Sequence, residues 1–106
     1  MDKEAVLIII KAFQKALESR QIKVENFVLY GSYAEDRFRE GSDIDLIVIS
    51  NDFSDKGYWQ RIDVIADAVY EVFQPIEAIA MTPDEWERKD SLIAKYASGG
   101  EVINAA

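Results

Sequence analysis

The chain has 106 residues and a formal net charge of −8 at pH 7, and it is long enough for one domain with one hydrophobic core, spanning residues 1–106. It contains no cysteine and no histidine, which excludes disulfides, thiolate or histidine metal sites and Ser-His-Asp catalysis, and leaves carboxylates as the acid/base groups. The negative charge repels phosphate backbones and therefore disfavours a broad nucleic-acid interface.

The first twenty residues predict a helix. Asp2 can cap its start, and apolar residues recur at helical spacing from Val6 to Leu17. A run of three further apolar residues at positions 7–9 widens this stripe beyond what one core-facing side needs. Two explanations remain: the helix lies deep in the domain, which the pattern favours, or it also meets a partner.

A short strand, a glycine and a serine come next. The strand is expected at Phe27–Tyr30 and ends at Gly31. A short helix is expected from Ser32 to about Phe38, because Ser32 and Glu35 have the S-x-x-E spacing of a capping box. A charged loop then leads to the next strand.

The middle of the chain predicts a buried strand and a long helix. The apolar run within Asp43–Ser50 indicates a strand buried on both faces, in a central position of its sheet. After a polar loop, Tyr58–Phe73 predicts the most regular helix of the chain. One face of this helix is apolar, with Trp59, Ile62, Ala66, Val69 and Phe73.

The last third of the chain continues the alternation. A third strand is expected at Ile76–Ala80, followed by a helix start in which Thr82 is the cap and Pro83 the first helical residue. The helical pattern breaks near Asp90, and a short edge strand is expected at Glu101–Ile103. Alternating helices and strands indicate an α/β (α+β) domain.

The candidate site lies between Tyr30 and Ser50. A Gly-Ser pair is followed by ten residues and then by Asp43-Ile44-Asp45. Alternate residues of a strand share a face, so Asp43 and Asp45 are expected to project together and to suit a hard divalent cation, most naturally Mg²⁺. Gly31 would let a phosphate approach closely, and Ser32 offers a hydroxyl and a backbone N–H.

A third carboxylate is expected from a neighbouring strand. Glu77 is the acidic residue of the strand expected after the long helix. Each feature also has a structural explanation: Asp-x-Asp as turn chemistry, Ser32 as a helix cap alone, and Glu77 as a solvent-facing edge residue. Three acids and a Gly-Ser turn at this spacing together favour a functional site.

The same residues resemble a known signature. Gly-Ser, ten residues and Asp-x-Asp is similar to the nucleotidyltransferase motif of the DNA polymerase β superfamily, and the chain length resembles its minimal nucleotidyltransferase (MNT) branch. The resemblance implies the nucleotidyltransferase fold, a small mixed β-sheet with helices packed mainly on one face. It implies ATP as substrate and Mg²⁺ as cofactor.

The resemblance also implies roles for individual residues. Gly31 and Ser32 would hold the triphosphate, and Arg39 matches a second arginine of the pattern. Asp43 and Asp45 would bind the metal, and Glu77 would be a metal ligand or general base, in a position where the family more often has aspartate.

Partners are implied in the same way. Members of this branch often act as the antitoxin of a HEPN-domain ribonuclease, and some attach AMP to tyrosines of that partner. We therefore expect AMP transfer from ATP to a protein acceptor, with a HEPN-type partner or a homodimer completing the site. The alternative is a module that has lost catalysis and neutralises its partner by binding. No apolar run is long enough to span a membrane, and the start of the chain lacks signal-peptide features, so a cytoplasmic protein is expected.

One departure from the family pattern bears on activity. Many members read Gly-Ser-x-Ala-Arg-Gly, whereas this chain has Glu35 and Asp36 at the last two positions. A basic residue and a glycine beside the phosphate site are thus replaced by acids. Glu35 is expected to compete with phosphate for backbone N–H groups, and Arg37 lies close enough in sequence to compensate.

Overall fold

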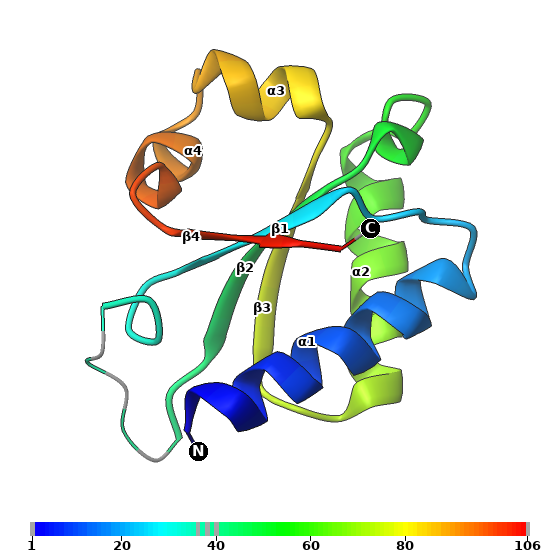
Figure 1. The fold of residues 1–106 in the computed structure, drawn as a ribbon. Helices are drawn as coiled ribbons and strands as arrows, with labels where there is room; N and C mark the ends of the chain where they lie inside the picture. The colour runs from blue at the N-terminus through cyan, green and yellow to red at the C-terminus, as the bar shows by residue number, and fades with distance from the viewer. Residues whose placement is uncertain (1, 36, 38, 40, 106) are drawn as a thin grey trace.

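A four-stranded mixed sheet forms the centre of the computed structural model, which describes residues 2–35, 37, 39 and 41–105 (Figure 1). The strand order is β3-β2-β1-β4; β1 is antiparallel to both β2 and β4, and β2 is parallel to β3. The strands are β1 Asn26–Tyr30, β2 Ile44–Ile49, β3 Ile76–Met81 and β4 Glu101–Asn104. The helices are α1 Lys3–Glu18, α2 Tyr58–Val72, α3 Pro83–Arg88 and α4 Leu92–Ala97, with a 3₁₀ turn at Asn51–Phe53.

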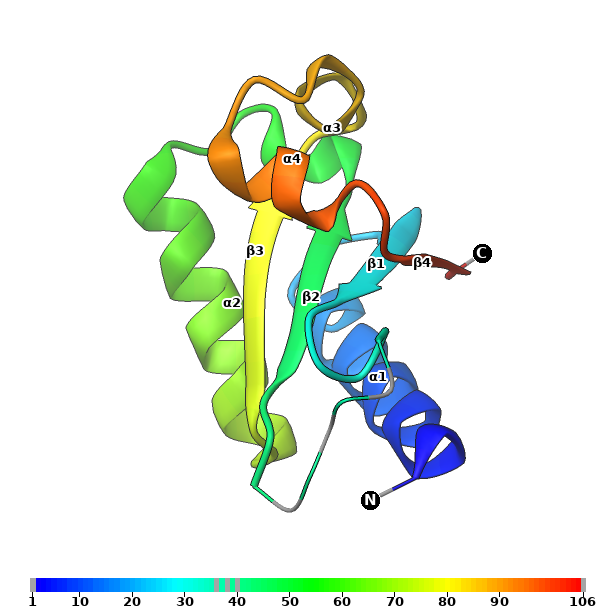
Figure 2. The ribbon, with the colours of Figure 1, turned by 90° about the vertical axis from the view of Figure 1, so that its left-hand side faces the viewer.

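The helices divide between the two faces of the sheet. The long helices α1 and α2 cover one face, and the short helices α3 and α4 lie over one end of the other (Figures 1 and 2). The larger apolar cluster lies between the sheet and the long helices, and a smaller one lies beneath α4. The predicted mixed α/β fold, with helices mainly on one face, is confirmed.

Helix α1 begins as the sequence predicts and buries one face, but it does not lie deep in the domain, because Leu7 and Ile8 are exposed. The Asp2 carboxylate accepts a hydrogen bond from the Ala5 N–H (2.9 Å) and so satisfies one of the free donors of the first turn. Val6, Phe13 and Leu17 are fully buried against the sheet. Within the described residues, no helix is long and apolar enough to cross a membrane.

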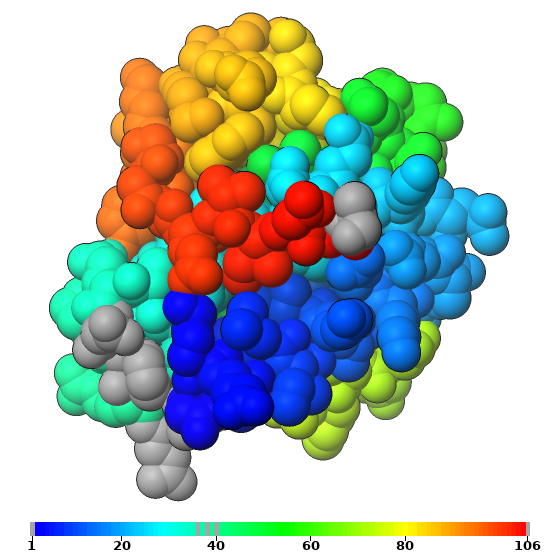
Figure 3. Space-filling model, viewed as in Figure 1, coloured from blue at the N-terminus to red at the C-terminus, as the bar shows by residue number. Residues whose placement is uncertain are grey.

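The C-terminal strand lies beside α1 on the surface. Figure 3 shows β4 and the start of α1 next to each other. Lys3 forms an ion pair with Glu101, and the Gln14 side chain donates a hydrogen bond to the Ala105 carbonyl (2.6 Å). The expected edge strand near the end of the chain is thus confirmed and is connected to the first helix.

Strand β2 is the buried, central strand that its apolar run predicts. Ile44, Leu46, Ile47 and Val48 have no exposed surface, because β1 and β3 flank the strand and helices lie over both faces. Helix α2 connects β2 to β3, and a helical crossover of this kind makes the two strands parallel.

The short helix expected at Ser32–Phe38 is wrong over the described residues. Gly31–Glu35 is a turn, in which the Glu35 N–H donates to the Gly31 carbonyl and the Arg37 N–H donates to the Ser32 carbonyl. The Glu35 carboxylate bonds to Arg37 and does not close a capping box. An ion pair two residues along the chain has replaced the helix-start geometry; Phe38 itself lies outside the described residues.

The apolar stripe of α2 exists, but much of it is exposed. The buried residues of α2 are Ile65 and Ala68, which lie outside the predicted stripe, whereas Trp59 of the stripe is 72% exposed and Phe73, just after the helix, is 83% exposed. The reason is the position of α2 beside β3, which is an edge strand. Helical periodicity identifies an apolar face, but it does not reveal whether the sheet is wide enough to cover that face.

The break expected near Asp90 is confirmed. Helix α3 ends at Arg88, and Lys89 adopts a left-handed conformation (φ 53°) before α4 starts. The Thr82 cap is confirmed as well, since the Thr82 hydroxyl accepts from the Glu85 N–H and the Glu85 carboxylate accepts from the Thr82 N–H. This is a complete capping box.

Candidate active site

The three predicted strands bring the candidate acids to neighbouring positions. In the sheet register, Asp45 of β2 lies opposite Tyr30 of β1 and opposite Glu77 of β3. Asp45 shares its face of the sheet with Ile47, which packs in the cluster beneath α4. Asp43 lies two residues earlier, just before β2, and is exposed. The site therefore lies on the face opposite α1 and α2.

Gly31 is in direct contact with this site. Its φ is +73°, a conformation that side chains disfavour, and a Cβ built on it would lie 2.3 Å from Asp45 Oδ2. Glycine is thus required twice, once for the turn and once for the approach of the carboxylate. The predicted association of the Gly-Ser turn with the Asp-x-Asp pair is present in the structure, and Ser32 lies half-buried in the same turn.

The acids perturb one another electrostatically. Burial is the largest effect and raises the pKa of Asp45 to about 6, aided by the hydrogen bond that the protonated Asp45 donates to Glu77 and by the charges of Glu77 and Asp43. Burial, followed by the charges of Asp45 and Glu77, likewise raises the pKa of Tyr30 to about 12. Both shifts disfavour negative charge, so the site has an excess of negative charge that a cation would relieve.

The donor set suits a hard divalent cation. Carboxylate oxygens are the ligands that Mg²⁺ prefers, and Asp45 and Glu77 are close enough to share a proton. Among the described residues, however, no three acidic side chains converge closely enough to hold a metal ion as they stand. The pair Asp45–Glu77 is therefore the part of the predicted three-carboxylate set that the structure brings into contact.

The predicted basic residue of the site is not seen beside the acids. The backbone N–H of Arg39 donates to the Ser42 hydroxyl (3.0 Å), and its side chain is exposed in the loop. Arg37 is paired with Glu35 through hydrogen bonds of 3.1 and 3.3 Å. Glu35 thus binds a cation rather than backbone N–H groups, and Asp36 lies outside the described residues.

Tyr96 of α4 is a site neighbour that the sequence argument did not identify. Its ring packs edge-on against Tyr30, with ring centroids 5.8 Å apart, and it is 61% exposed. The pKa of Arg37 is raised, first by its hydrogen bond with Glu35, then by the negative charge of Glu35, and to a smaller extent by Tyr96. Nothing in the sequence around Tyr96 indicates that α4 returns to the end of β1.

Comparison with known proteins agrees with this geometry. Residues 10–96 match the family described as "Nucleotidyltransferase domain". A proposed nucleotidyltransferase from Sulfolobus solfataricus, solved at 1.40 Å resolution, is 18% identical, with a TM-score of 0.62 over 77% of this chain and 71% of its own. Another proposed nucleotidyltransferase is 21% identical, with a TM-score of 0.55 over 96% and 98% of the two chains. No curated protein matches the chain.

These two structures share the fold, and the family match runs from the second half of α1 through the Gly-Ser turn, the Asp-x-Asp strand and Glu77. The resemblance to the DNA polymerase β-like nucleotidyltransferases is thereby confirmed. The chain belongs to the nucleotidyltransferase domain family.

Proposed function

We propose that this protein transfers AMP from ATP to a hydroxyl group of a partner protein in the cytoplasm. The observation that best supports this proposal is the contact of Gly31 with Asp45, which places a glycine turn against the acid that faces Glu77. A turn without a side chain beside paired carboxylates suits a metal-bound triphosphate. The net charge of −8 favours a protein acceptor over RNA.

Asp43, Asp45 and Glu77 are the residues that would hold Mg²⁺, and the donor chemistry fits that ion. When bound, Mg²⁺ supplies positive charge that neutralises the triphosphate. Gly31 leaves room for the phosphates, and Ser32 offers its hydroxyl and N–H to them. Arg39, which matches the second arginine of the family pattern, would approach the phosphates from its loop.

In the proposed transfer, the acceptor oxygen forms a bond to the α-phosphorus, and the bond from that phosphorus to the bridging oxygen breaks. Pyrophosphate leaves, and the acceptor proton passes to Glu77 as general base. Asp45 lies in register with Glu77 and would position this carboxylate. The substrate of this reaction would be ATP, and the proposed acceptor is a HEPN-type ribonuclease, although a homodimer would also supply acceptor hydroxyls.

One observation favours a second function. Arg37, the residue best placed in sequence to replace the missing family arginine, is engaged by Glu35. A phosphate site that has lost one of its two cations binds nucleotide more weakly. In that case the protein is a nucleotidyltransferase-fold module that neutralises its partner by binding alone.

The two functions are distinguished with ATP labelled at the α-phosphate and a purified HEPN-domain ribonuclease. Transfer predicts label on the ribonuclease and its inactivation, both lost in Asp45→Asn. The exposed acid Asp55, which pairs with Lys56, provides the matched control Asp55→Asn, which should keep both activities. Neutralisation of the ribonuclease that persists in Asp45→Asn without any label would support the binding module instead.

A further inference from the structure

A tyrosine of α4 lies beside the acids of the candidate site. Tyr30 is opposite Asp45 in the antiparallel register of β1 and β2, and side chains that are directly opposite each other lie on the same face of a sheet. The ring of Tyr96 packs edge-on against Tyr30, with 5.8 Å between the ring centroids. Tyr96 therefore lies on the face that carries Asp45 and Glu77, next to the residue that is paired with Asp45.

The charges around Tyr96 agree with this proximity. Burial raises the pKa of Tyr30 most, followed by the charges of the two site acids, and Tyr96 adds to the same rise. The pKa of Arg37 is raised mainly by Glu35 and to a smaller extent by Tyr96, so this guanidinium lies near the phenol oxygen. A cation in that position favours the negative charge that develops on the oxygen when it gives up its proton.

Burial or position separates the other tyrosines from this role. The chain has five tyrosines. Tyr30 and Tyr33 are buried, with 7% and 2% of their surface exposed. Tyr58 and Tyr70 are exposed, but they belong to α2, which covers the opposite face of the sheet (Figure 1). Tyr96 is 61% exposed and is the tyrosine that combines an accessible hydroxyl with a place on the face of the acids.

A phenol is a suitable acceptor for a site whose bases are carboxylates. The chain contains no histidine that could activate an aliphatic hydroxyl. A tyrosine hydroxyl ionises near about pH 10, so it needs a weaker base than the hydroxyl of serine or threonine does. The half-buried Ser32, the other hydroxyl close to the acids, belongs to the turn that is proposed to hold the phosphates.

We propose that the protein modifies itself by transferring AMP from ATP to the hydroxyl of Tyr96. This inference rests on the proposed AMP transfer and assigns to it an acceptor within the chain. The phenolic oxygen forms a bond to the α-phosphorus, the bond from that phosphorus to the bridging oxygen breaks, and pyrophosphate leaves with the electron pair. The phenolic proton passes to Glu77. The product carries one AMP in a phosphodiester linkage on Tyr96, beside its own site.

The fold holds this acceptor in place, which favours transfer within one chain. Ala94 and Ala97 bury the inner face of α4 against the sheet, and Tyr30 contacts the ring of Tyr96. A nucleophile that is fixed beside a bound phosphate reacts as if it were present at a very high concentration. The net charge of −8 on each copy also opposes the approach of a second chain.

The test incubates the full chain with Mg²⁺ and ATP labelled at the α-phosphate, without a partner protein. The intact mass of the chain is measured before and after, so that a modification acquired during expression is also detected. We expect one adenylyl group per chain, which peptide mass spectrometry locates on Tyr96. ATP labelled at the γ-phosphate should leave no label, because pyrophosphate carries that phosphate away.

The chain supplies matched variants for this test. Tyr96→Phe keeps the ring that packs against Tyr30 and removes the acceptor oxygen, so the fold should survive and the label should be lost. Tyr58→Phe and Tyr70→Phe remove exposed hydroxyls on the opposite face and should keep the label.

A mixture of two chains tests whether the transfer is intramolecular. The native chain is incubated with Asp45→Asn, which keeps Tyr96 but loses the central acid and carries a larger affinity tag. Intact mass spectrometry resolves the two chains, and only the native chain should carry AMP.

Several outcomes would overturn the proposal. Label that persists in Tyr96→Phe would place the acceptor elsewhere, and AMP on Asp45→Asn in the mixture would assign the transfer to a pair of copies. A native chain that stays unmodified but labels the HEPN-domain ribonuclease would overturn self-modification and leave the proposed function intact. A chain that labels neither protein and is not stabilised by MgATP would contradict both.

Discussion

At the scale of single residues, Gly31 connects the turn to the chemistry. Its positive φ and its contact with Asp45 are separate demands, and only glycine meets both. The sequence assigns a Gly-Ser turn and an Asp-x-Asp strand to one candidate site. It does not predict the atomic contact, which depends on the β1–β2 register.

Gly31→Ala and Gly41→Ala separate the two demands. Gly41 also has a positive φ (+88°), but a Cβ there would have nothing within 4 Å. Urea unfolding should show a loss of about 1 kcal/mol for Gly41→Ala, from backbone strain alone. Gly31→Ala should lose at least about 1 kcal/mol more, because the new methyl group collides with Asp45.

The double variant Gly31→Ala/Asp45→Ala checks the cause of that excess. Removing the carboxylate should return the cost of Gly31→Ala to roughly that of Gly41→Ala. An unchanged excess would mean that the two side chains do not meet.

Asp45 should reduce stability at neutral pH when no metal is present. Its pKa rises from 3.8 to about 6 in the folded protein, so the folded state holds this proton more tightly than the unfolded chain does. Stability therefore falls as the pH rises from about 4 to about 6. In EDTA at pH 7, Asp45→Asn should raise the free energy of unfolding by about 1 kcal/mol, allowing for partial exposure.

The pH series provides the control for that prediction. Below about pH 3, where Asp45 is protonated in both states, the two proteins should have the same stability. A less stable Asp45→Asn at pH 7 would show that burial and the neighbouring acids do not disfavour the ionised Asp45 carboxylate.

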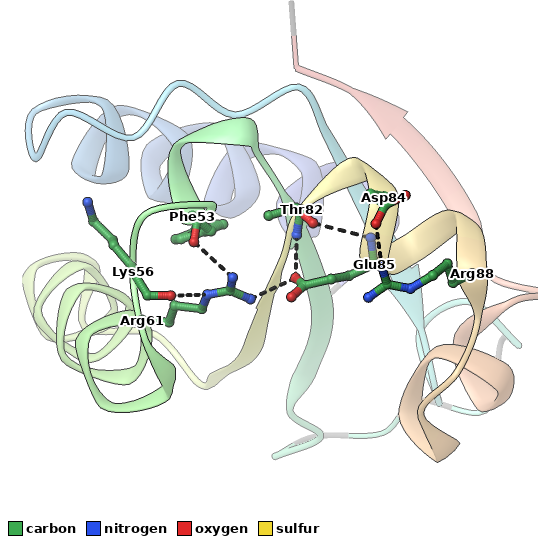
Figure 4. Close-up of polar contacts among 7 residues, drawn as sticks. All are labelled: Phe53, Lys56, Arg61, Thr82, Asp84, Glu85 and Arg88. Carbon is green, nitrogen blue, oxygen red and sulfur yellow. Dashed lines mark hydrogen bonds and ion pairs between the residues drawn. The ribbon is translucent and has the colours of Figure 1, made fainter.

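At the scale of elements, the start of α3 connects the sheet to α2. Thr82 and Glu85 form the capping box, and Arg61 of α2 donates to the same Glu85 carboxylate (2.7 Å) and to the Phe53 carbonyl (2.8 Å) (Figure 4). Burial alone would raise the pKa of Glu85. The hydrogen bonds from Arg61 and Thr82 and the positive charge of Arg61 outweigh burial, so the pKa of Glu85 is lowered.

Glu85→Gln should test the charge of this contact while keeping the cap, since glutamine also closes a capping box. A lowered native pKa means that the ionised form stabilises the fold, and this stability is lost as the pH falls below about 4.5, through the native pKa. At pH 7 the variant should lose about 0.5–1 kcal/mol, and the loss should shrink toward pH 3. Chemical unfolding at both pH values measures this loss of stability, and the exposed Asp84→Asn serves as the control. A loss of stability that is the same at pH 7 and pH 3 would contradict the prediction.

Most elements could be predicted because their signals are local. The Asp2 and Thr82 caps, the apolar run of β2 and the break after Arg88 are all encoded within a few residues. The helix expected after Ser32 failed because the same local pattern also fits a turn, and the ion pair of Glu35 with Arg37 accompanies the turn. The exposure of Trp59 could not be predicted, since it depends on where the sheet ends.

At the scale of the whole molecule, topology assembles the site. Helix α2 carries the chain from β2 to a parallel β3, and this crossover places Glu77 beside Asp45 across more than thirty residues of sequence. Glu77 could be predicted as the acid of the next strand, but not its register. Tyr96 could not be predicted, because only the packing of α4 against β1 places it beside Tyr30.

The most direct test of the nucleotide site is thermal unfolding with and without MgATP. A ligand at about 100 times its dissociation constant adds roughly 2.7 kcal/mol of stability, which is a shift of several degrees in a domain of this size. The account predicts that shift for the native chain and for Asp55→Asn, and its loss in Asp43→Asn/Asp45→Asn and in EDTA. An equal shift in the double variant, or none in the native chain, would contradict a metal–nucleotide site at Gly31, Asp43 and Asp45.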